Sequence, residues 1–337
     1  LKNVKDRAEA SVRFDAAMSL NATQQARARE NIGAGVLAGF RNKIINGNFD
    51  IWQRGNSFSI TNTGTYTADR WRVYGSSIAA ANVTVSRQGF VVGQEDVPGN
   101  PKYFLRLSKA TDNGNDTGIE QRIEDVTTLA GKVATLTLYI KGTAGKDITI
   151  KLTQNFGTGA ETEVFALDET ITLQSNWTKH TFSVSVPSVA GQTINENGSA
   201  SLRPQLVIPA SSGAVTIDIA RVSLVEGDAT AEDDPFSPRH IQQELALCQR
   251  YYEVLLFKNW STAHGAATRT GHSMPYKVEK RAVPTLTVLS SNNSSNVVEF
   301  NLETNGTTHT AAALVLSNSS TTGHLTLNAT VAADAEF

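Results

Sequence analysis

Apolar and polar residues alternate through the middle of the chain, and this alternation is the main structural signal in the sequence. Apolar side chains fall on every second position in four segments, which span residues 136–140, 148–152, 182–186 and 215–219. A period of two gives a strand one face in the core and one face in water. Turn signals rich in Gly, Asn and Ser separate these segments. Short alternating strands with such turns predict a mainly β protein built as an antiparallel sandwich.

The alternation changes phase near Arg221. Ile217 and Ile219 keep the period of two, but the next apolar residues are Val222 and Leu224. One extra residue in a strand produces such a slip, because it turns every following side chain to the opposite face. We therefore expect a β-bulge at Arg221.

Residues 1–40 follow a different pattern and are expected to form a helical joint. Apolar residues recur at every fourth position from Val4 to Ala16, which is a helical stripe. Because Ala dominates this stripe, it is too thin to stabilise a lone helix and favours packing against copies of itself. A second helix is predicted over residues 20–33, with Asn21 as its cap. For this second segment, an ordinary capped helix is the simpler alternative to an oligomerisation element.

The acidic stretch over residues 226–235 ends in proline and is typical of a linker. Ser237–Pro238 then offers a hydroxyl cap and a proline at the first helical position, and apolar residues at helical spacing continue to Leu255. Further strands are predicted over residues 274–279, 284–289, 297–302, 311–316 and 325–331. We therefore expect a β-domain at residues 41–226 and a C-terminal helix plus β-sandwich tip domain at residues 227–337.

Composition argues against several classes of function. The chain has 30 Lys and Arg against 32 Asp and Glu, so its net charge of −2 gives no general attraction to nucleic acid. No apolar run approaches the roughly 18 residues of a membrane helix, and no signal peptide opens the chain, so no membrane insertion is expected. The single cysteine, Cys248, excludes an intrachain disulfide and a Cys-rich zinc site.

Nothing in the sequence favours an enzyme. A glycosidase needs two carboxyl groups roughly 5 to 9.5 Å apart. Glu161 and Glu163 would lie about 7 Å apart on one face of a strand, but any solvated strand face has the same spacing. No Gly-x-Ser-x-Gly turn occurs, and the six histidines show no metal-binding spacing. We therefore expect no catalytic residues.

Aromatic and basic residues gather within residues 66–74. A sugar-binding site needs an aromatic ring for the apolar face of the sugar and polar side chains for its hydroxyl groups. Trp71 and Tyr74 are the leading candidates for the ring, although the Asp-Arg-Trp segment can instead form part of the core. Trp177 precedes a predicted strand and is expected to be structural. The candidate glycan contacts are Trp52, Tyr66, Trp71, Arg72, Tyr74 and, in the C-terminal domain, Trp260.

Three segments, residues 42–55, 66–74 and 239–252, resemble parts of bacteriophage tail-fibre and receptor-binding proteins. Those proteins carry a jelly-roll domain similar to xylanase-type carbohydrate-binding modules. The resemblance implies a homotrimeric adhesin in the tail of the virion. It would bind a bacterial surface polysaccharide or lipopolysaccharide for host attachment, without catalysis, and would assemble with other phage tail proteins. The alternatives are a purely structural fibre or baseplate component and a polysaccharide depolymerase.

The same resemblance implies a structural calcium ion between the first and last strands of the jelly roll. Calcium takes oxygen ligands, usually six or more. Asn48, Asp50 and Asp218 occupy the matching positions. The alternative is that Asp218 forms an ion pair with Arg221 or Arg70.

Overall fold

The computed structural model describes most of the chain from residue 41 onward. The described residues are 24, 27, 41–157, 163–195, 198–263, 269–293, 297–303, 307–308, 310–317 and 323–337. The predicted helical joint at residues 1–40 therefore lies outside the described residues, apart from Gln24 and Arg27, which are helical.

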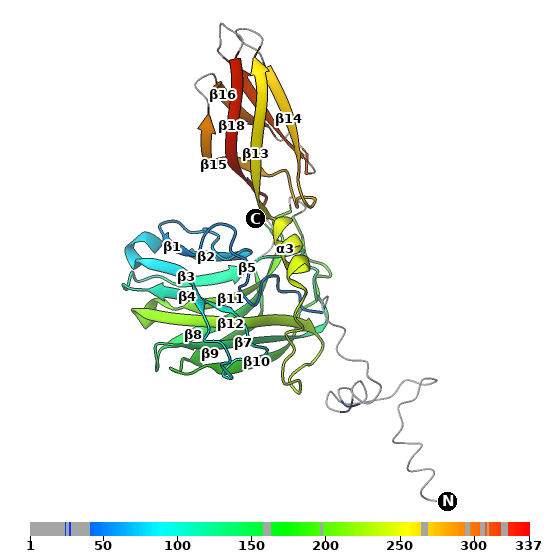
Figure 1. Ribbon diagram of the computed structural model, residues 1–337. Helices are drawn as coiled ribbons and strands as arrows, with labels where there is room; N and C mark the ends of the chain where they lie inside the picture. Colours follow the sequence, from blue (N-terminus) through cyan, green and yellow to red (C-terminus); the bar gives the residue numbers. More distant parts are fainter. Residues whose placement is uncertain are drawn as a thin grey trace, which may run out of the picture.

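The larger part of the structure is a jelly-roll sandwich of two antiparallel sheets (Figure 1). The first, here called the β12 sheet, runs in the order β1 (Ser57–Ile60), β3 (Val83–Gly89), β4 (Tyr103–Lys109), β12 (Val215–Glu226), β7 (Val133–Gly142), β10 (Thr178–Ser185). The second, here called the β11 sheet, runs β2 (Trp71–Gly75), β5 (Thr117–Gln121), β11 (Ser201–Ile208), β8 (Asp147–Asn155), β9 (Val164–Thr172), with β6 (Ile123–Glu124) beside β11. Two short 3₁₀ helices, η1 (Ile78–Ala81) and η2 (Ala210–Ser212), lie in the connections.

The predicted mainly β fold is confirmed, and the four alternating segments are strands β7, β8, β10 and β12. Their apolar positions turn inward between the two sheets, where residues such as Leu138, Ile150 and Ile217 are completely or almost completely buried. The alternation predicted these strands correctly because the inner face of each strand is shielded from water, whereas its outer face is partly exposed to water.

The β-bulge expected at Arg221 is confirmed. The pairing of β12 with β7 shifts register between Ala220 and Ser223, and Arg221 has a left-handed backbone with φ of 52°. The N–H of Val222 is donated to the carbonyl oxygen of Gly47 at 2.9 Å, so the segment before the first strand is tied to the bulge. The bulge also turns the Arg221 guanidinium to Asp234, with Nε 2.9 Å from Oδ2.

The helix predicted from Ser237 to Leu255 is shorter than expected at both ends. Helix α3 spans Ile241–Gln249, and the side chain of His240 caps it by accepting the N–H of Gln242. Ser237 is not the cap, because its backbone is left-handed with φ of 50°. After the helix, β13 (Tyr252–Ala263) begins at once. The apolar run at its start fits the helical period and the strand period equally well, and pairing with β18 decides for the strand.

The C-terminal strands form a second, smaller sandwich. One sheet has the order β13, β18 (Gly323–Asp334), β15 (Thr285–Asn293), and the other has the order β14 (Arg269–Pro275), β17 (Thr310–Ser317), β16 (Val297–Glu303). Four of the predicted strands correspond to β15, β16, β17 and β18 with ends shifted by a few residues. The strand predicted over residues 274–279 overlaps β14 only at Met274 and Pro275, and β13 was not predicted. A small core that includes Leu255, Phe257 and Val331 lies between the sheets.

The terminal sandwich stands on one end of the jelly roll, with α3 beside the junction (Figure 1). The C-terminus returns to this junction, so the last residues of the chain contact the jelly roll. No helix among the described residues is both long and apolar enough to cross a membrane.

Candidate functional site

Two of the predicted glycan contacts, Trp52 and Trp71, lie in the core of the jelly roll. The Trp71 side chain is 0% exposed, lies 5.1 Å from the Phe49 ring and donates its indole N–H to the carbonyl oxygen of Asn46 at 3.1 Å. Trp52 is 9% exposed and donates its indole N–H to the carbonyl oxygen of Phe49 at 2.7 Å. A ring without an accessible face cannot stack on a sugar, so the prediction of glycan contact is wrong for both residues.

Trp71 is buried because successive side chains of strand β2 point to opposite faces of the sheet. Trp71 and Val73 point into the core, so Arg72 and Tyr74 point to the outer face. The Asp-Arg-Trp segment therefore forms part of the core, which was the alternative interpretation of these residues.

Tyr66 belongs to the junction with the terminal sandwich. The Arg54 guanidinium lies 5.3 Å from the Tyr66 ring centroid and 3.6 Å from that of Tyr252. Burial is the main cause that raises the pKa of the Tyr66 hydroxyl to about 12. The ring is half-buried beside Arg54, and glycan contact by Tyr66 stays a prediction.

Two further arginine and amide contacts complete the junction. Arg70 is fully buried, stacks 3.3 Å from the Tyr251 ring centroid and forms an ion pair with Glu336. Gln53 Nε2 donates to the carbonyl oxygen of Tyr252 at 2.8 Å. Arg70, from the segment that suggested a sugar site, therefore helps to bind the two domains together.

The calcium prediction is wrong for Asp218, and the residues present do not fit a calcium shell. Both carboxylate oxygens of Asp218 accept N–H groups of Arg106, at 2.7 and 2.8 Å. Asn48 Nδ2 donates to Asp50 Oδ2 at 3.1 Å, and burial is the main cause that raises the pKa of Asp50. Among the described residues, no three His, Cys, Asp or Glu side chains gather as metal ligands. The alternative prediction, an ion pair of Asp218 with Arg221 or Arg70, is also wrong, because Asp218 pairs with Arg106 instead.

The outer face of the β11 sheet carries the best-built polar site. One cross-strand row contains, in spatial order, Arg72, Glu120, Gln205, Lys151 and Asp168, each directly opposite the next. Directly opposed residues on one face have their Cβ atoms about 5 Å apart, so adjacent side chains in the row can interact. The row has one residue on each of β2, β5, β11, β8 and β9 and is here called the polar row.

Glu120 organises the first half of the polar row. Its carboxylate accepts N–H groups from Arg72 at 2.7 Å, Arg122 at 2.9 Å and Gln205 at 2.9 Å. Burial by itself raises the pKa of Glu120, but the positive charges of Arg122, Arg203 and Arg72 outweigh it, and the pKa is lowered. Glu120 is therefore an ionised anchor beneath the guanidinium groups.

A second ion pair lies next to the polar row. Arg203 on β11 is 3.1 Å from Glu163 Oε1, and its Nε donates to Ser201 Oγ at 2.9 Å. Burial and then the charge of Arg122 are the leading causes that lower the pKa of Arg203. The guanidinium is thus crowded by other cations in a partly desolvated place.

Two aromatic rings flank this polar surface. Tyr74 lies across Gly118, where an added Cβ would be 2.7 Å from the ring, so glycine is needed for the ring to take this place. The Tyr74 hydroxyl is buried without a hydrogen-bond partner among the described residues. Phe165 on β9 is 49% exposed, and Lys151 Nζ lies 4.9 Å from its ring centroid. Phe165 therefore offers an open ring beside charged and amide groups.

Of the predicted glycan contacts, only Arg72 and Tyr74 reach this surface. The backbone of Trp260 is part of β13, but its side chain lies outside the described residues. Glu161 is also outside them, and its predicted partner Glu163 is paired with Arg203. Phe165 was missed, because it lies in the apolar run Val164–Leu167, where no alternation distinguishes an outward side chain from an inward one.

A second polar surface lies on the outer face of the β12 sheet. Phe90, Phe104 and Trp177 pack together with centroids 4.9 to 5.3 Å apart, and Trp177 is partly exposed rather than fully buried. Lys141 Nζ lies 5.0 Å from the Trp177 centroid and 3.9 Å from Asp218. The ion-paired groups line a shallow groove of about 340 Å³. Here the bidentate pairing of Asp218 with Arg106 leaves few groups open for a ligand.

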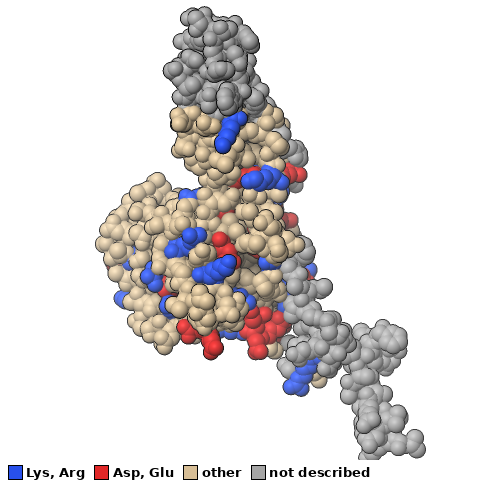
Figure 2. All heavy atoms as spheres, viewed as in Figure 1, with Lys and Arg blue, Asp and Glu red and all other residues tan. Residues whose placement is uncertain are grey.

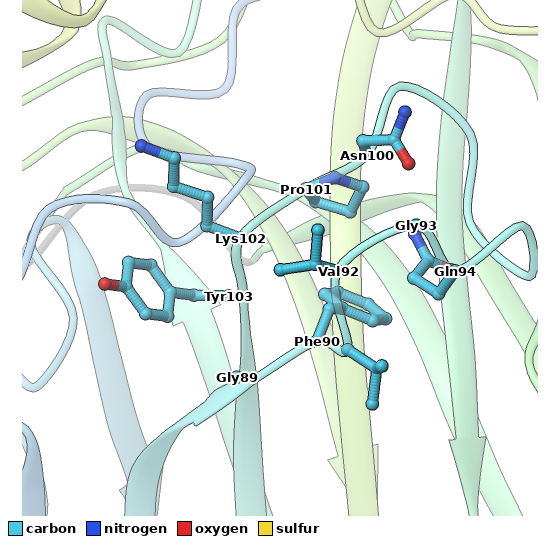
Figure 3. A pocket seen from close by; sticks show the side chains of 10 residues that line it. Gly89, Phe90, Val92, Gly93, Gln94, Asn100, Pro101, Lys102 and Tyr103 are labelled. Carbon is cyan, nitrogen blue, oxygen red and sulfur yellow. The ribbon is translucent and has the colours of Figure 1, made fainter.

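A third hollow, of about 620 Å³, is formed by the loop that joins β3 to β4. Phe90, Val92 and Pro101 line it with apolar surface, and Lys102 and Tyr103 stand at one side (Figure 3). Val91 and Val92 are highly exposed. The hollow has the chemistry of a protein contact more than that of a sugar site.

The face of the jelly roll seen in Figure 2 has basic and acidic side chains interspersed among neutral ones. A mixed surface of this kind provides no broad electrostatic attraction, so any charge preference must come from a local group of residues.

Comparisons with known proteins give fold likeness only. No protein-family model matches the sequence, and no curated protein matches it. Among solved structures, the chain is similar to the enzymatically active domain of tailspike protein 4 of bacteriophage CBA120, with 16% identity and a TM-score of 0.35 over 55% of this chain and 21% of that one. The chain thus spans about a fifth of the tailspike chain.

It is also similar to the CBM22-2 xylan-binding domain of Paenibacillus barcinonensis Xyn10C, with 14% identity and a TM-score of 0.30 over 51% of this chain and 98% of that one. A third similar structure is TmCBM61 in complex with β-1,4-galactotriose, with 14% identity and a TM-score of 0.32 over 56% of this chain and 99% of that one. Identities and TM-scores this low carry no argument about the ligand or the activity of this protein. Any such argument must come from the residues of this chain.

Proposed function

We propose that this protein binds glycans on the outer face of the β11 sheet and serves as a non-catalytic adhesin of a phage tail fibre. The observation that carries the proposal is the polar row, which lies between the exposed ring of Phe165 and the ring of Tyr74. An aromatic ring beside several fixed hydrogen-bonding groups is the equipment that a sugar requires.

The chemistry of recognition follows from the positions of these groups. The apolar face of a sugar ring packs on Phe165, while Lys151, whose ammonium group lies beside the Phe165 ring, reaches the hydroxyl oxygens of the sugar. Glu120 holds Arg72 and Gln205 in place before any ligand arrives. Groups that are already ordered lose little conformational entropy on binding, so even a shallow site gains affinity.

The same geometry favours binding without hydrolysis. A glycosidase needs one carboxyl group that stays protonated to act as the acid. Glu120 has a lowered pKa and three hydrogen-bond donors, so it is ionised. Glu163 is paired with Arg203. Neither carboxylate has the environment of a general acid.

The phage assignment rests on the sequence resemblance of residues 42–55, 66–74 and 239–252 to tail-fibre proteins. We extend it to a homotrimer in the virion, attached to other tail proteins and directed at a surface polysaccharide or lipopolysaccharide. Exposed apolar residues on the terminal sandwich, including Leu256 and Leu289, support self-association. Three weak sites on one trimer would bind a repetitive glycan with useful avidity.

A glycan array with host polysaccharides tests the proposal, using the wild type, Phe165→Ala and a control Val92→Ala. Phe165 and Val92 are both exposed, but Val92 is on the β3–β4 loop, away from the polar row. We expect Phe165→Ala to weaken glycan binding about tenfold and Val92→Ala to have no effect. Equal binding by the wild type and Phe165→Ala would place the site elsewhere.

The main alternative is a purely structural fibre component, and the exposed Val91 and Val92 favour it. Such a protein would bind no glycan on the array and would not protect host cells from infection. A depolymerase is the other alternative. It would release reducing sugar from the host polysaccharide, and Phe165→Ala would slow that release.

A further inference from the structure

Basic side chains concentrate at one end of the outer face of the β11 sheet. Four cations and three carboxylates lie in or next to the polar row. The cations are Arg72, Arg122, Arg203 and Lys151, and the carboxylates are Glu120, Glu163 and Asp168. Three of the four cations are guanidinium groups that meet around Glu120 at one end of the row.

Two of these guanidinium groups have most of their N–H donors unused. Among the described residues, Arg72 and Arg122 each donate one side-chain hydrogen bond, and both go to Glu120 Oε1. Both side chains remain partly exposed, at 17% and 16%. Each guanidinium carries five N–H donors in a planar fork that fits a carboxylate or phosphate in a bidentate way.

Glu120 cannot satisfy these donors further. Its two oxygens already accept three N–H groups, and it is almost fully buried beneath the guanidinium groups. Burial, and after it the charge of the neighbouring Arg122, lower the pKa of Arg203, so like charges crowd this end of the row. An anionic group placed above Arg72 and Arg122 would use the free donors and relieve this repulsion.

We propose that the site selects acidic oligosaccharides, in which the carboxylate or phosphate group of one sugar unit binds Arg72 and Arg122 while another unit of the same chain packs on Phe165. This inference rests on the proposed glycan-binding function and adds the ligand class. The shared chemistry is an anionic oxygen group on a sugar, so hexuronates and phosphate-bearing sugars both qualify.

Calorimetric titration of the full chain with matched ligands tests this. The ligands are an oligogalacturonate, its fully methyl-esterified form as the neutral match, and a phosphate-bearing oligosaccharide. At least one acidic ligand should bind about tenfold or more tightly than the ester, and raising the salt concentration should weaken only the acidic binding. Which acidic arm binds identifies the source of the charge.

The variant Arg122→Gln should abolish the preference for the acidic ligands over the neutral ester. Lys141→Gln, on the β12 sheet, is the matched control and should keep the preference, because its charge lies on the opposite face. If Arg122→Gln melts at a lower temperature than the wild type, Arg122→Lys replaces it as the test variant. Arg122→Lys keeps the charge and should retain part of the preference for acidic ligands. Equal affinity for acidic and neutral ligands would overturn the inference and leave the proposed function standing. Absence of binding to all three ligands would overturn both.

Discussion

Replacing Glu336 with glutamine should loosen the terminal sandwich from the jelly roll. Glu336 is 4% exposed in its side chain, and its partner Arg70 is 0% exposed. Arg70 is fixed in place by the Tyr251 ring at 3.3 Å and by the carbonyl oxygen of Arg122. It cannot swing into water when its counter-charge is removed. The variant therefore leaves a buried guanidinium without a carboxylate.

Breaking a buried ion pair in this way costs about 3–5 kcal/mol, whereas an exposed pair contributes about 0–1 kcal/mol. The exposed pair Lys132–Glu226 is a matched control within the same chain. Its atoms are 2.8 Å apart, and its side chains are 53% and 51% exposed. Glu226→Gln should thus leave the free energy of unfolding almost unchanged, although the distance between the charged atoms is that of an ordinary ion pair.

Urea denaturation with hydrogen-exchange readout of β13 and β18 measures the cost where it arises. We expect Glu336→Gln to lower the free energy of opening of these strands by about 3–5 kcal/mol and Glu226→Gln by less than about 1 kcal/mol. A double variant, Arg70→Met with Glu336→Leu, should recover much of the loss, because it removes both charges. If both single variants cost the same small amount, the junction is not held by this buried pair.

Three further predictions follow from other parts of the structure. Gly47→Ala should lower the melting temperature strongly, because its Cβ would lie 2.1 Å from the carbonyl oxygen of Val222. Gly89→Ala is the control and should leave the melting temperature unchanged, because no atom lies within 4 Å of its added Cβ. Equal melting temperatures of the two variants would contradict this prediction. The folded pKa of Glu120 is below its ordinary 4.5, so its ion pairs stabilise the fold above that pH and this contribution is lost as pH falls through the folded pKa. The difference in unfolding free energy between wild type and Glu120→Gln, followed by urea titration, should therefore be largest at neutral pH and shrink in acid; a constant difference would refute the assignment. Sedimentation at micromolar concentration should give a trimer, and a stable monomer would count against the proposed fibre.

The sequence predicted the β fold because its evidence is local. Alternation over five residues was enough to place β7, β8 and β12, and the change of phase between Ile219 and Val222 was enough to locate the bulge. Each of these signals lies within a few residues of the feature it describes, and burial of one strand face is what creates it.

The site was harder to predict because its decisive contacts join distant segments. Arg70 and Glu336 are 266 positions apart, and Glu120 and Gln205 are 85 apart. Within β2, aromatic residues occupy both parities, so the sequence could not decide whether Trp71 or Tyr74 faces the core. Pairing of β2 with β5 makes that decision, and no local pattern encodes the register of that pairing.

Hydroxyl-radical footprinting with and without a bound acidic oligosaccharide tests the central claim most directly, because it reads the accessibility of individual aromatic side chains. The claim predicts that the ligand protects Phe165 from oxidation and leaves Trp177, on the opposite sheet, unchanged. Protection of Trp177 with no change at Phe165 would show that the glycan binds the β12 sheet and would contradict it.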